Sequence, residues 1–338
     1  MISKNFLKDK VVFLTGGTGS FGNAFIDYLI SNNLFPKKLI IFSRDELKQH
    51  EMQQHKFPND KYDFLRYFIG DIRDKDRLYR AMEGVDIVVH AAALKHVSVA
   101  EYNPSEFIKT NILGTQNLLE IAIENDIDSF ISLSTDKASS PVNLYGATKL
   151  CSDKLVISSN NIKGTRKIRF SVVRYGNVFG SRGSVIPLFL RLIEENKPIQ
   201  ITDPEMTRFN ISLLEGVKMV IWAIHNAFGG EILVPKIPSY KVADLIKAFN
   251  IKENVQIIGL RPGEKIHEEM ISAADSYNTI DIGDYFVILQ KENDNLIKHY
   301  QKLSKNEYPR GMSYDSSNNS HFLSIKELEF LIDNYKSS

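Results

Sequence analysis

The sequence predicts an α/β fold in which a doubly wound parallel sheet is followed by a smaller C-terminal domain. Short apolar runs alternate with amphipathic helical patterns through the first half of the 338 residues. The runs are continuously apolar, as expected of parallel strands that are buried on both faces. After residue 177 the alternation gives way to helical patterns separated by loops that contain Pro and Gly, which indicates a second unit.

The expected elements follow the chain in this order. Strands are expected at residues 11–14, 39–42, 67–69, 87–90, 130–133 and 170–173. Helices between them are expected at residues 23–31, 46–57, 73–82, 104–125 and 145–158. Later helices are expected at residues 185–195, 213–227, 242–249 and 325–335, and the Ser- and Asn-rich segment 313–320 is expected to be a mobile loop. We therefore expect one domain at residues 1–177 and another mainly at 178–338, with later strands free to return to the first.

The composition excludes several classes of partner. The chain carries 42 basic and 41 acidic residues and a formal net charge of +1, so charge does not favour nucleic acid or anionic membrane. Its single cysteine, Cys151, excludes an intrachain disulfide and fits a reducing compartment. The N-terminus is charged where a signal peptide is apolar, and no apolar run reaches the roughly 18 residues of a membrane span. We expect a soluble cytoplasmic protein without a metal site.

A glycine-rich turn follows the first expected strand and precedes a helix. Gly16 permits the tight turn, Gly19 lets the backbone approach a pyrophosphate, and Gly22 allows close helix packing. The N–H groups and dipole at the helix start favour phosphates. Such a turn can be purely structural, but its position in an alternating series predicts a Rossmann-like dinucleotide site. The expected contacts in this turn are Thr15, Gly16, Thr18, Gly19, Ser20, Phe21 and Gly22.

The end of the second strand bears on which dinucleotide is bound. An acid there grips the ribose 2′-hydroxyl of NAD, whereas basic residues suit the 2′-phosphate of NADP. Arg44 and Lys48 favour NADP, while Asp45 keeps NAD open. Asp71 is expected near the adenine, and Ala91 to Ala93 near the nicotinamide. The further expected cofactor contacts are Ser43, Arg44, Asp45, Glu46, Leu47, Lys48, Asp71, Ile72, Ala91, Ala93, Lys95, Tyr145, Lys149 and Val178.

A tyrosine and a lysine four residues apart share one face of the fifth expected helix. Tyr145 is a poor base on its own, because a phenol has a pKa of about 10. The ammonium of Lys149, together with an oxidised nicotinamide, would stabilise its phenolate. Tyr145 could then take a hydroxyl proton as hydride leaves the same carbon, with a hydroxyl at or near Thr135 assisting. The pair therefore predicts oxidation of an alcohol.

An acid and an amine, Asp136 and Lys137, follow the fifth expected strand. Simple oxidation or epimerisation does not require them, whereas an elimination does. Once C4 of a sugar is a ketone, a base can remove the acidic C5 hydrogen while an acid protonates the departing C6 hydroxyl. The alternative is a mutual ion pair or a solvated turn, which we disfavour because neighbours in a strand point to opposite faces.

These motifs together resemble the extended short-chain dehydrogenase/reductases, and in particular the inverting UDP-N-acetylglucosamine 4,6-dehydratases. That family opens pseudaminic acid biosynthesis in bacteria that glycosylate flagellin. The matching stretches cover nearly the whole chain and lie at residues 15–22, 43–49, 91–97, 134–149, 174–178, 206–209, 234–239 and 261–265.

The resemblance implies roles for particular residues. Lys137 would take the C5 proton, Asp136 would protonate the C6 hydroxyl, and Tyr145 with Lys149 would run the redox step. The UDP-N-acetylglucosamine contacts it implies are Lys95, Tyr145, Asn177, Arg208, Arg261 and Glu264. It also implies a homo-oligomer, often a hexamer, and a 4-keto product inverted at C5.

Three alternatives stay open from the residues. A nucleotide-sugar 4-epimerase of the same superfamily would make Asp136 and Lys137 incidental. Retaining hexose 4,6-dehydratases typically carry an Asp-Glu pair at this place. A non-catalytic NADP-binding regulator would have kept the fold and lost turnover, but the intact catalytic set argues against it.

Overall fold

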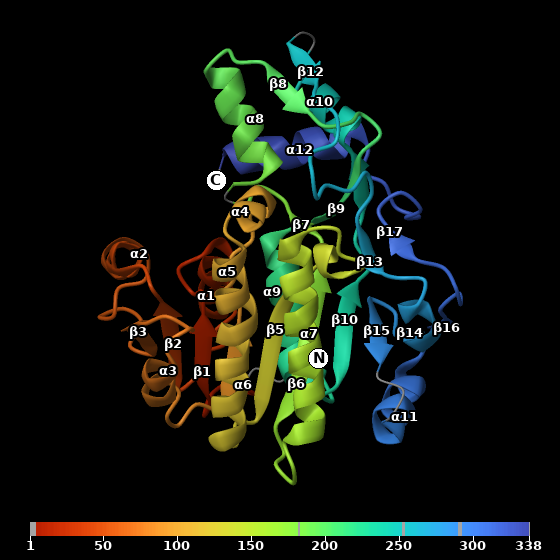
Figure 1. Cartoon of the computed structure of the whole chain (residues 1–338). Coiled ribbons are helices and arrows are strands. Elements are labelled where there is room, and N and C mark those ends of the chain that lie inside the picture. Colours follow the sequence, from red (N-terminus) through yellow and green to blue (C-terminus); the bar gives the residue numbers. More distant parts are fainter. Residues whose placement is uncertain (1–4, 182, 252–253, 290–292, 338) are drawn as a thin grey trace.

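A computed structural model of the chain describes residues 5–181, 183–251, 254–289 and 293–337 (Figure 1). Within these residues, the core of the largest sheet runs parallel in the order β3-β2-β1-β4-β5-β6-β10. These strands are β1 (Val11–Thr15), β2 (Lys38–Ser43), β3 (Leu65–Ile69), β4 (Ile87–His90), β5 (Ser129–Thr135), β6 (Arg169–Tyr175) and β10 (Glu231–Pro235). The predicted doubly wound α/β fold is confirmed, and each predicted strand lies within an observed one.

Three strands late in the chain extend the same sheet beyond β10. They are β14 (Thr279–Asp281), β15 (Tyr285–Leu289) and β16 (Asn306–Glu307). They pair antiparallel, in the order β10-β15-β14-β16. Segments from beyond residue 178 therefore complete the sheet that the first half begins.

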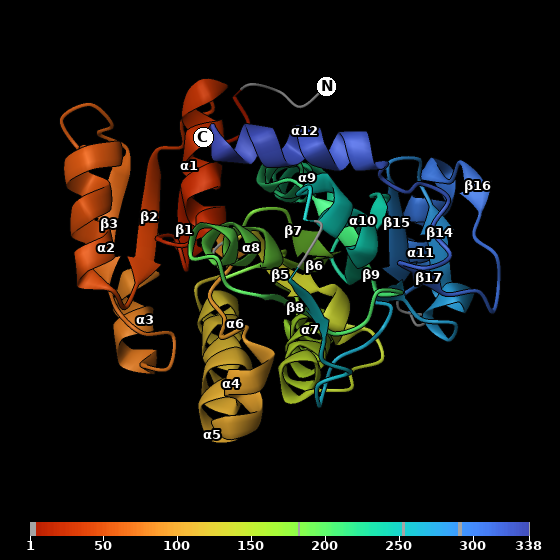
Figure 2. The ribbon, with the colours of Figure 1, turned by 90° about the horizontal axis from the view of Figure 1, so that it is seen from above.

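Helices cover both faces of the sheet, with α1 packed beside α9 on one face and α6 beside α3 and α7 on the other (Figure 2). The helices are α1 (Ser20–Ser31), α2 (Glu46–Glu51), α3 (Lys75–Ala81), α4 (Val97–Tyr102), α5 (Pro104–Phe107), α6 (Gly114–Glu124), α7 (Leu144–Ile162), α8 (Val185–Glu194), α9 (Leu213–Asn226), α10 (Val242–Ala248), α11 (Asp294–Leu303) and α12 (Ile325–Lys336). Two segments are π-helical, η1 (Met52–Lys56) and η2 (Ile108–Leu113), and two are 3-10 turns, η3 (Asp136–Ala138) and η4 (Asp275–Asn278). No helix in the described part of the chain combines the length and apolar character that crossing a membrane requires.

A smaller unit stands beyond the carboxyl ends of the parallel strands (Figure 1). Its pairings are β11-β9-β7, β8 with β12, and β13 with β17. These strands are β7 (Asn177–Val178), β8 (Ile199–Ile201), β9 (Thr207–Ile211), β11 (Ser239–Lys241), β12 (Val255–Ile257), β13 (Glu269–Ile271) and β17 (Tyr314–Asp315). A second apolar cluster, which includes Phe189, Leu245 and Leu328, joins α8, α10 and α12, whereas the main core lies against the large sheet. The unit thus has its own packing and faces the strand ends.

The predicted helix at 104–125 is divided by the π-helical turn η2. The amide of Asn111 in this turn binds both backbone groups of Leu94, each at 2.9 Å. It also donates to Thr148 Oγ1 at 3.0 Å. Amphipathic periodicity does not reveal this irregularity, which ties the segment after β4 to α7.

The expectation of a mobile loop at 313–320 is wrong. Tyr314 and Asp315 pair with β13, and Ser316 is fully buried with its hydroxyl 2.6 Å from Thr207 Oγ1. The side-chain amide of Asn319 donates to the carbonyl of Ile237 at 2.7 Å. The polar side chains that suggested disorder instead satisfy backbone and hydroxyl groups of neighbouring segments.

Candidate active site

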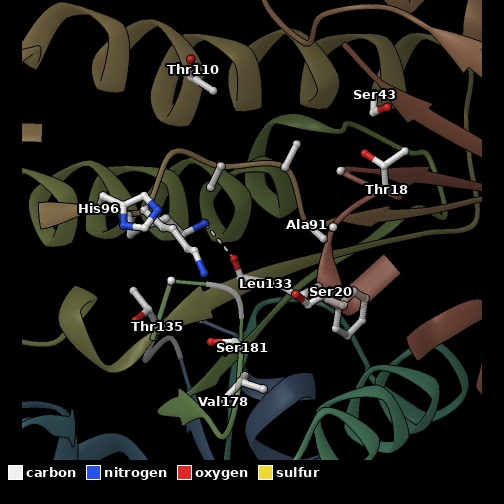
Figure 3. Close-up of a pocket in the computed structure, with 18 of the residues that line it drawn as sticks. Thr18, Ser20, Ser43, Ala91, His96, Thr110, Leu133, Thr135, Val178 and Ser181 are labelled. Carbon is white, nitrogen blue, oxygen red and sulfur yellow. Dashed lines mark hydrogen bonds between the residues drawn. The ribbon is translucent and has the colours of Figure 1, made fainter. Parts of the chain in front are cut away.

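A cavity of about 630 Å³ opens at the carboxyl ends of β1, β4, β5 and β6 (Figure 3). Strand order reverses between β1 and β4, which is where doubly wound sheets bind their ligands. The cavity is lined from both parts of the chain, from Gly16 in the first turn to Ser184 and Leu213 in the second half. The sheet topology therefore brings the predicted cofactor turn and the predicted catalytic residues to one site.

The glycine turn has the geometry expected of a pyrophosphate cradle. Gly16 has a φ of +68°, and a Cβ there would lie 2.9 Å from the backbone of Ala92. A Cβ on Gly22 would lie 2.1 Å from the carbonyl oxygen of Gly17, so α1 can approach the turn only without one. The N-cap of α1 is Gly19, and no side chain caps the helix. Its first N–H groups thus suit an anionic group, and the residues present fit a dinucleotide.

Thr15 does not line the cavity, although it was expected to contact the cofactor. It is fully buried, and its hydroxyl lies 2.8 Å from His90 Nδ1 and accepts the N–H of Ala92 at 3.2 Å. Burial lowers the pKa of His90 to about 3, with the charge of Lys149 acting in the same direction. A neutral imidazole therefore supports the turn from behind.

The end of β2 presents basic groups to the cavity. Arg44 is half exposed, and its guanidinium lies 3.6 Å from Asp71 Oδ2. The carboxylate of Asp45 caps α2 by accepting the N–H of Lys48 at 3.0 Å, and it lies 2.5 Å from the ammonium of Lys48. Asp45, the residue that would favour NAD, is thus already bound to the first turn of its own helix.

Helix α7 presents the predicted redox pair from its first turns. Burial raises the pKa of Tyr145 to about 12, while the charge of Lys137 and a hydrogen bond with Thr135 oppose that rise. Lys149 donates to the carbonyl of Leu133 at 2.7 Å (Figure 3), and burial lowers its pKa. A Cβ on Gly146 would lie only 2.2 Å from the carbonyl oxygen of Lys137. This close approach brings α7 against the turn that carries the second predicted pair.

Asp136 and Lys137 form an ion pair, contrary to the expectation that they point to opposite faces. The ammonium of Lys137 lies 3.1 Å from Asp136 Oδ1 and 3.4 Å from Asn177 Oδ1. The reason is local: β5 ends at Thr135, and both residues lie in the 3-10 turn η3, where the alternation of a strand no longer holds. Thr135 accepts the N–H of Lys137 and donates to Asp136 at 2.9 Å.

A second carboxylate, that of Glu268, belongs to this cluster and was not predicted. Its Oε1 lies 3.2 Å from the ammonium of Lys137 and 4.0 Å from Arg208 Nε. Burial would lower the pKa of Lys137, but Asp136 and Glu268 hold it above its ordinary value. Burial raises the pKa of Asp136, and the charge of Glu268 adds to that rise while Lys137 opposes it. Burial would also raise the pKa of Glu268, yet Lys137 and Arg208 hold it below its ordinary value.

Most of the predicted site residues line the cavity. Those that do are Gly16, Thr18, Gly19, Ser20, Phe21, Ser43, Arg44, Asp45, Lys48, Asp71, Ile72, Ala91, Ala93, Lys95, Thr135, Lys137, Tyr145, Lys149, Asn177 and Val178. Those absent from the lining are Thr15, Gly22, Glu46, Leu47, Asp136, Arg208, Arg261 and Glu264. Lining residues that the sequence did not single out include His96, Ser181, Gly183, Ser184 and Leu213. Of these, His96 follows the predicted Lys95 in the chain. The imidazole ring of His96 packs so closely against Gly183 that a Cβ there would lie 2.9 Å from it.

The two arginines expected to contact UDP-N-acetylglucosamine, Arg208 and Arg261, are not in the cavity lining. The guanidinium of Arg208 donates to the carbonyls of residues 207, 265 and 266 at 2.7–3.0 Å. Arg261 is largely exposed and lies 4.0 Å from Glu264 Oε1, which belongs to its own loop. Lys95 lies in the cavity wall, and burial lowers its pKa. Among the described residues, no cluster of His, Cys, Asp and Glu is arranged to hold a metal ion.

Comparison with known proteins shows which family the chain resembles. A family model described as polysaccharide biosynthesis protein matches residues 12–290. The chain is 51% identical over 332 residues to the inverting UDP-N-acetylglucosamine 4,6-dehydratase of Campylobacter jejuni subsp. jejuni serotype O:2, covering 96% of this chain and 97% of that protein. It is 42% identical over 304 residues to a UDP-glucose 4-epimerase of Rickettsia canadensis, covering 88% of each.

A solved structure extends the likeness to three dimensions. The X-ray structure of Pen from Bacillus thuringiensis superposes with a TM-score of 0.87 at 39% identity, over 97% of this chain and 99% of that one. The chain therefore belongs to the polysaccharide biosynthesis protein family, and its predicted resemblance to the inverting UDP-N-acetylglucosamine 4,6-dehydratases is confirmed.

Proposed function

We propose that the protein catalyses the NADP-dependent dehydration of UDP-N-acetylglucosamine with inversion at C5. The product would be UDP-2-acetamido-2,6-dideoxy-β-L-arabino-hexos-4-ulose. The observation that carries this proposal is that Lys137 lines the same cavity as Tyr145 and Lys149 and contacts Asp136, which is buried directly behind it. The latter pair suffices for oxidation or epimerisation, whereas an added acid and amine suit elimination. The likeness to a named dehydratase supports the choice of substrate.

The redox half depends on Tyr145 and Lys149. A bound oxidised nicotinamide would accept hydride from C4 and later return it to C6, and C5 would then receive a new proton to give the 4-keto product. Tyr145 takes the proton of the C4 hydroxyl, and the positive charge of Lys137 favours its phenolate. Lys149 is buried, and its hydrogen bond to the carbonyl of Leu133 in β5 holds its ammonium in place. Both residues sit four positions apart on α7, so one helix presents them on the same face.

The elimination half depends on Asp136 and Lys137. The amine must be neutral before it can accept the C5 proton, yet the surrounding carboxylates favour its ammonium form. A proton passing from Lys137 to Asp136, across the 3.1 Å that separates them, leaves an amine and a carboxylic acid. The amine then takes the C5 proton, the C5–H electrons form the C5–C6 double bond, and the C6–O bond breaks. Asp136 gives its proton to the departing oxygen, which leaves as water.

The finer assignments rest on the cavity wall and on the family. Arg44 and Lys48 stand where a 2′-phosphate would need positive charge, which supports NADP over NAD. Lys95 and Asn177 line the cavity and would contact the UDP-sugar, while the roles of Arg208, Arg261 and Glu264 stay predictions. We infer action in the cytoplasm as a homo-oligomer, with a hexamer implied by the family. The product would open pseudaminic acid biosynthesis for flagellin or surface glycans.

The second candidate is a UDP-sugar 4-epimerase, which the likeness to the Rickettsia canadensis protein favours. An epimerase would oxidise C4 and reduce it again from the other face, so C6 would keep its hydroxyl. The buried ion pair of Asp136 and Lys137 would then have no chemical task.

The test is to incubate the purified protein with UDP-N-acetylglucosamine in deuterium oxide and to follow the sugar by proton NMR. Dehydration predicts a C6 methyl group, deuterium at C5 and proton couplings of the L-arabino configuration. A retained C6 hydroxyl with a changed C4 configuration would establish the epimerase instead. A first product that has a C6 methyl group but an unchanged C5 configuration would refute inversion and leave the dehydratase assignment standing.

A further inference from the structure

The carboxylate of Glu268 is buried beside the amine of Lys137, and the reaction described above gives it no task. Its side chain is 5% exposed, and its Oε1 lies 3.2 Å from Lys137 Nζ. Its Oε2 has no hydrogen-bond partner within the described residues. A buried carboxylate oxygen without a hydrogen bond destabilises a fold unless nearby charge compensates for it. That charge comes from Lys137 and, at 4.0 Å, from Arg208.

Backbone hydrogen bonds hold the segment 265–270, which carries Glu268, on several sides. Arg208 donates to two of its carbonyl oxygens at 2.9 and 3.0 Å, and Arg174 donates to a third at 3.0 Å. Ser316 accepts the N–H of Glu268 at 3.0 Å and donates its own N–H to the carbonyl of Glu268 at 2.8 Å. The carboxylate is therefore held rigidly toward Lys137.

The two carboxylates beside Lys137 differ in how readily they take a proton. The ionisable groups that face its amine are those of Asp136, Tyr145, Arg208, Tyr240 and Glu268. Lys137 faces both carboxylates, and Arg208 adds a second positive charge beside Glu268, 4.0 Å from its Oε1. Lys137 and Arg208 hold the pKa of Glu268 low against its burial, whereas burial raises the pKa of Asp136. Glu268 is thus the carboxylate that stays ionised, and Asp136 is the one that takes up a proton.

We propose that Glu268 is a positioning residue for the elimination, which holds the Lys137 amine against Asp136 and leaves Asp136 as the carrier of the mobile proton. This role rests on the proposed function, because it concerns the same acid and amine. The carboxylate of Glu268 contacts Lys137 and Arg208, so we assign it a role through the Lys137 amine and none on the sugar. Its charge also opposes deprotonation of Lys137 until the proton passes to Asp136, which keeps the amine from acting prematurely.

The first test needs no turnover. Neutral amines react with acetic anhydride and ammonium groups do not, so mass spectrometry of peptides labelled at fixed pH reports the neutral fraction of Lys137. An opposite charge at this distance shifts a pKa by about one unit or more. Glu268→Gln should therefore raise the labelling of Lys137 on the order of tenfold, relative to other lysines in the digest. Glu269→Gln is the matched control, because that carboxylate accepts from Ser139 and Ser140 and not from Lys137. Equal labelling in all three proteins, or an equal rise in both variants, overturns the proposal.

The second test uses the pH profile of the reaction. In Glu268→Gln the acidic limb of sugar dehydration should move to lower pH by about one unit, while reduction of NADP on mixing with substrate keeps its pH dependence. A loss of rate that is the same at every pH contradicts a positioning role. If Glu268→Gln does not fold, Glu268→Asp replaces it, because the shorter side chain keeps the negative charge but moves it away from the Lys137 amine. This variant should show a smaller rise in labelling of Lys137, and the absence of any rise would refute the proposal. If labelling of Lys137 rises in Glu268→Gln but the unaltered protein has no dehydratase activity, the proposed function is rejected, whereas the effect of Glu268 on the Lys137 amine stands.

Discussion

Gly146 provides a sharp test of how the two catalytic pairs are brought together. It occupies the first turn of α7, directly after Tyr145, and a Cβ there would lie 2.2 Å from the carbonyl oxygen of Lys137. Side-chain Cβ atoms essentially never approach closer than 3.0 Å, so Gly146→Ala must move α7 and η3 apart by at least the difference, 0.8 Å. The Cβ is fixed by the backbone of α7 and the carbonyl oxygen belongs to the backbone of η3, so no side-chain rotation can relieve the contact.

The expected cost of Gly146→Ala is large in rate and moderate in stability. A misplacement of about 1 Å can lower a rate on the order of 100-fold, and overpacking typically destabilises a fold by about 1–3 kcal/mol. Helix propensity alone predicts the opposite sign, because Ala in a helix is favoured over Gly by roughly 0.5–1 kcal/mol. The steric term therefore has to exceed the propensity term.

The matched control is Gly216→Ala in α9. A Cβ at Gly216 would meet the ring of Tyr175 at 3.7 Å, an ordinary van der Waals contact. This variant should therefore keep its rate and gain a little stability. The assays are thermal unfolding by circular dichroism and the initial rate of C6 methyl formation by NMR. If Gly146→Ala matches Gly216→Ala in both, the close approach of α7 to η3 does not control the site.

Three further outcomes are expected. Arg44→Ala should weaken NADP binding by about 1.5–3 kcal/mol, the value of a hydrogen bond to a charged group, and leave NAD nearly unchanged; equal losses by calorimetry would refute the 2′-phosphate contact. Lys137→Ala should still form NADPH on mixing with substrate but yield no 6-deoxy sugar, whereas Tyr145→Phe should form none; normal turnover of Lys137→Ala would show that the base lies elsewhere. Burial raises the pKa of Glu231 to about 7 from an ordinary 4.5, so the folded state retains a proton that the unfolded chain has released. Stability should therefore fall as pH rises from 4.5 to 7, and Glu231→Gln should remove most of this loss, about 3 kcal/mol, in urea titrations at several pH values.

Local sequence signals were enough for the parallel half of the fold. Continuous apolar runs mark strands wherever both faces of a sheet are covered, and the expected strand at 87–90 coincides with β4. The glycine turn and the pair of Tyr145 and Lys149 are likewise encoded within short windows, so their convergence on the cavity follows from the order of strands. The edge strands β14 and β16 have only three and two residues. Their place in the large sheet depends on long-range antiparallel pairing, of β15 with β10, of β14 with β15 and of β16 with β14.

The third charged member of the elimination cluster could not be predicted from local signals. Glu268 is 131 positions from Lys137, and its neighbours Lys265, His267 and Glu269 are also polar, so composition does not distinguish it. Its position depends on the pairing of β13 with β17 and on the buried hydroxyl of Ser316. That hydroxyl lies in the very segment whose composition suggested disorder. Long-range hydrogen bonding, and not local propensity, selects this residue.

The 3-10 turn η3 explains why the acid and the amine can work as a pair. In an extended strand Asp136 and Lys137 would point to opposite faces, and no proton could pass directly between them. Because β5 ends at Thr135, whose hydroxyl caps the turn and binds Asp136, the two side chains meet at 3.1 Å. The same turn presents the Lys137 carbonyl to α7 at the one position, Gly146, that lacks a Cβ. One backbone feature therefore sets both the proton transfer within the pair and the distance of the pair from α7. A substitution that straightens η3 should disable elimination and oxidation together, whereas loss of the Lys137 amine alone should slow oxidation without abolishing it, because its charge only assists the Tyr145 phenolate.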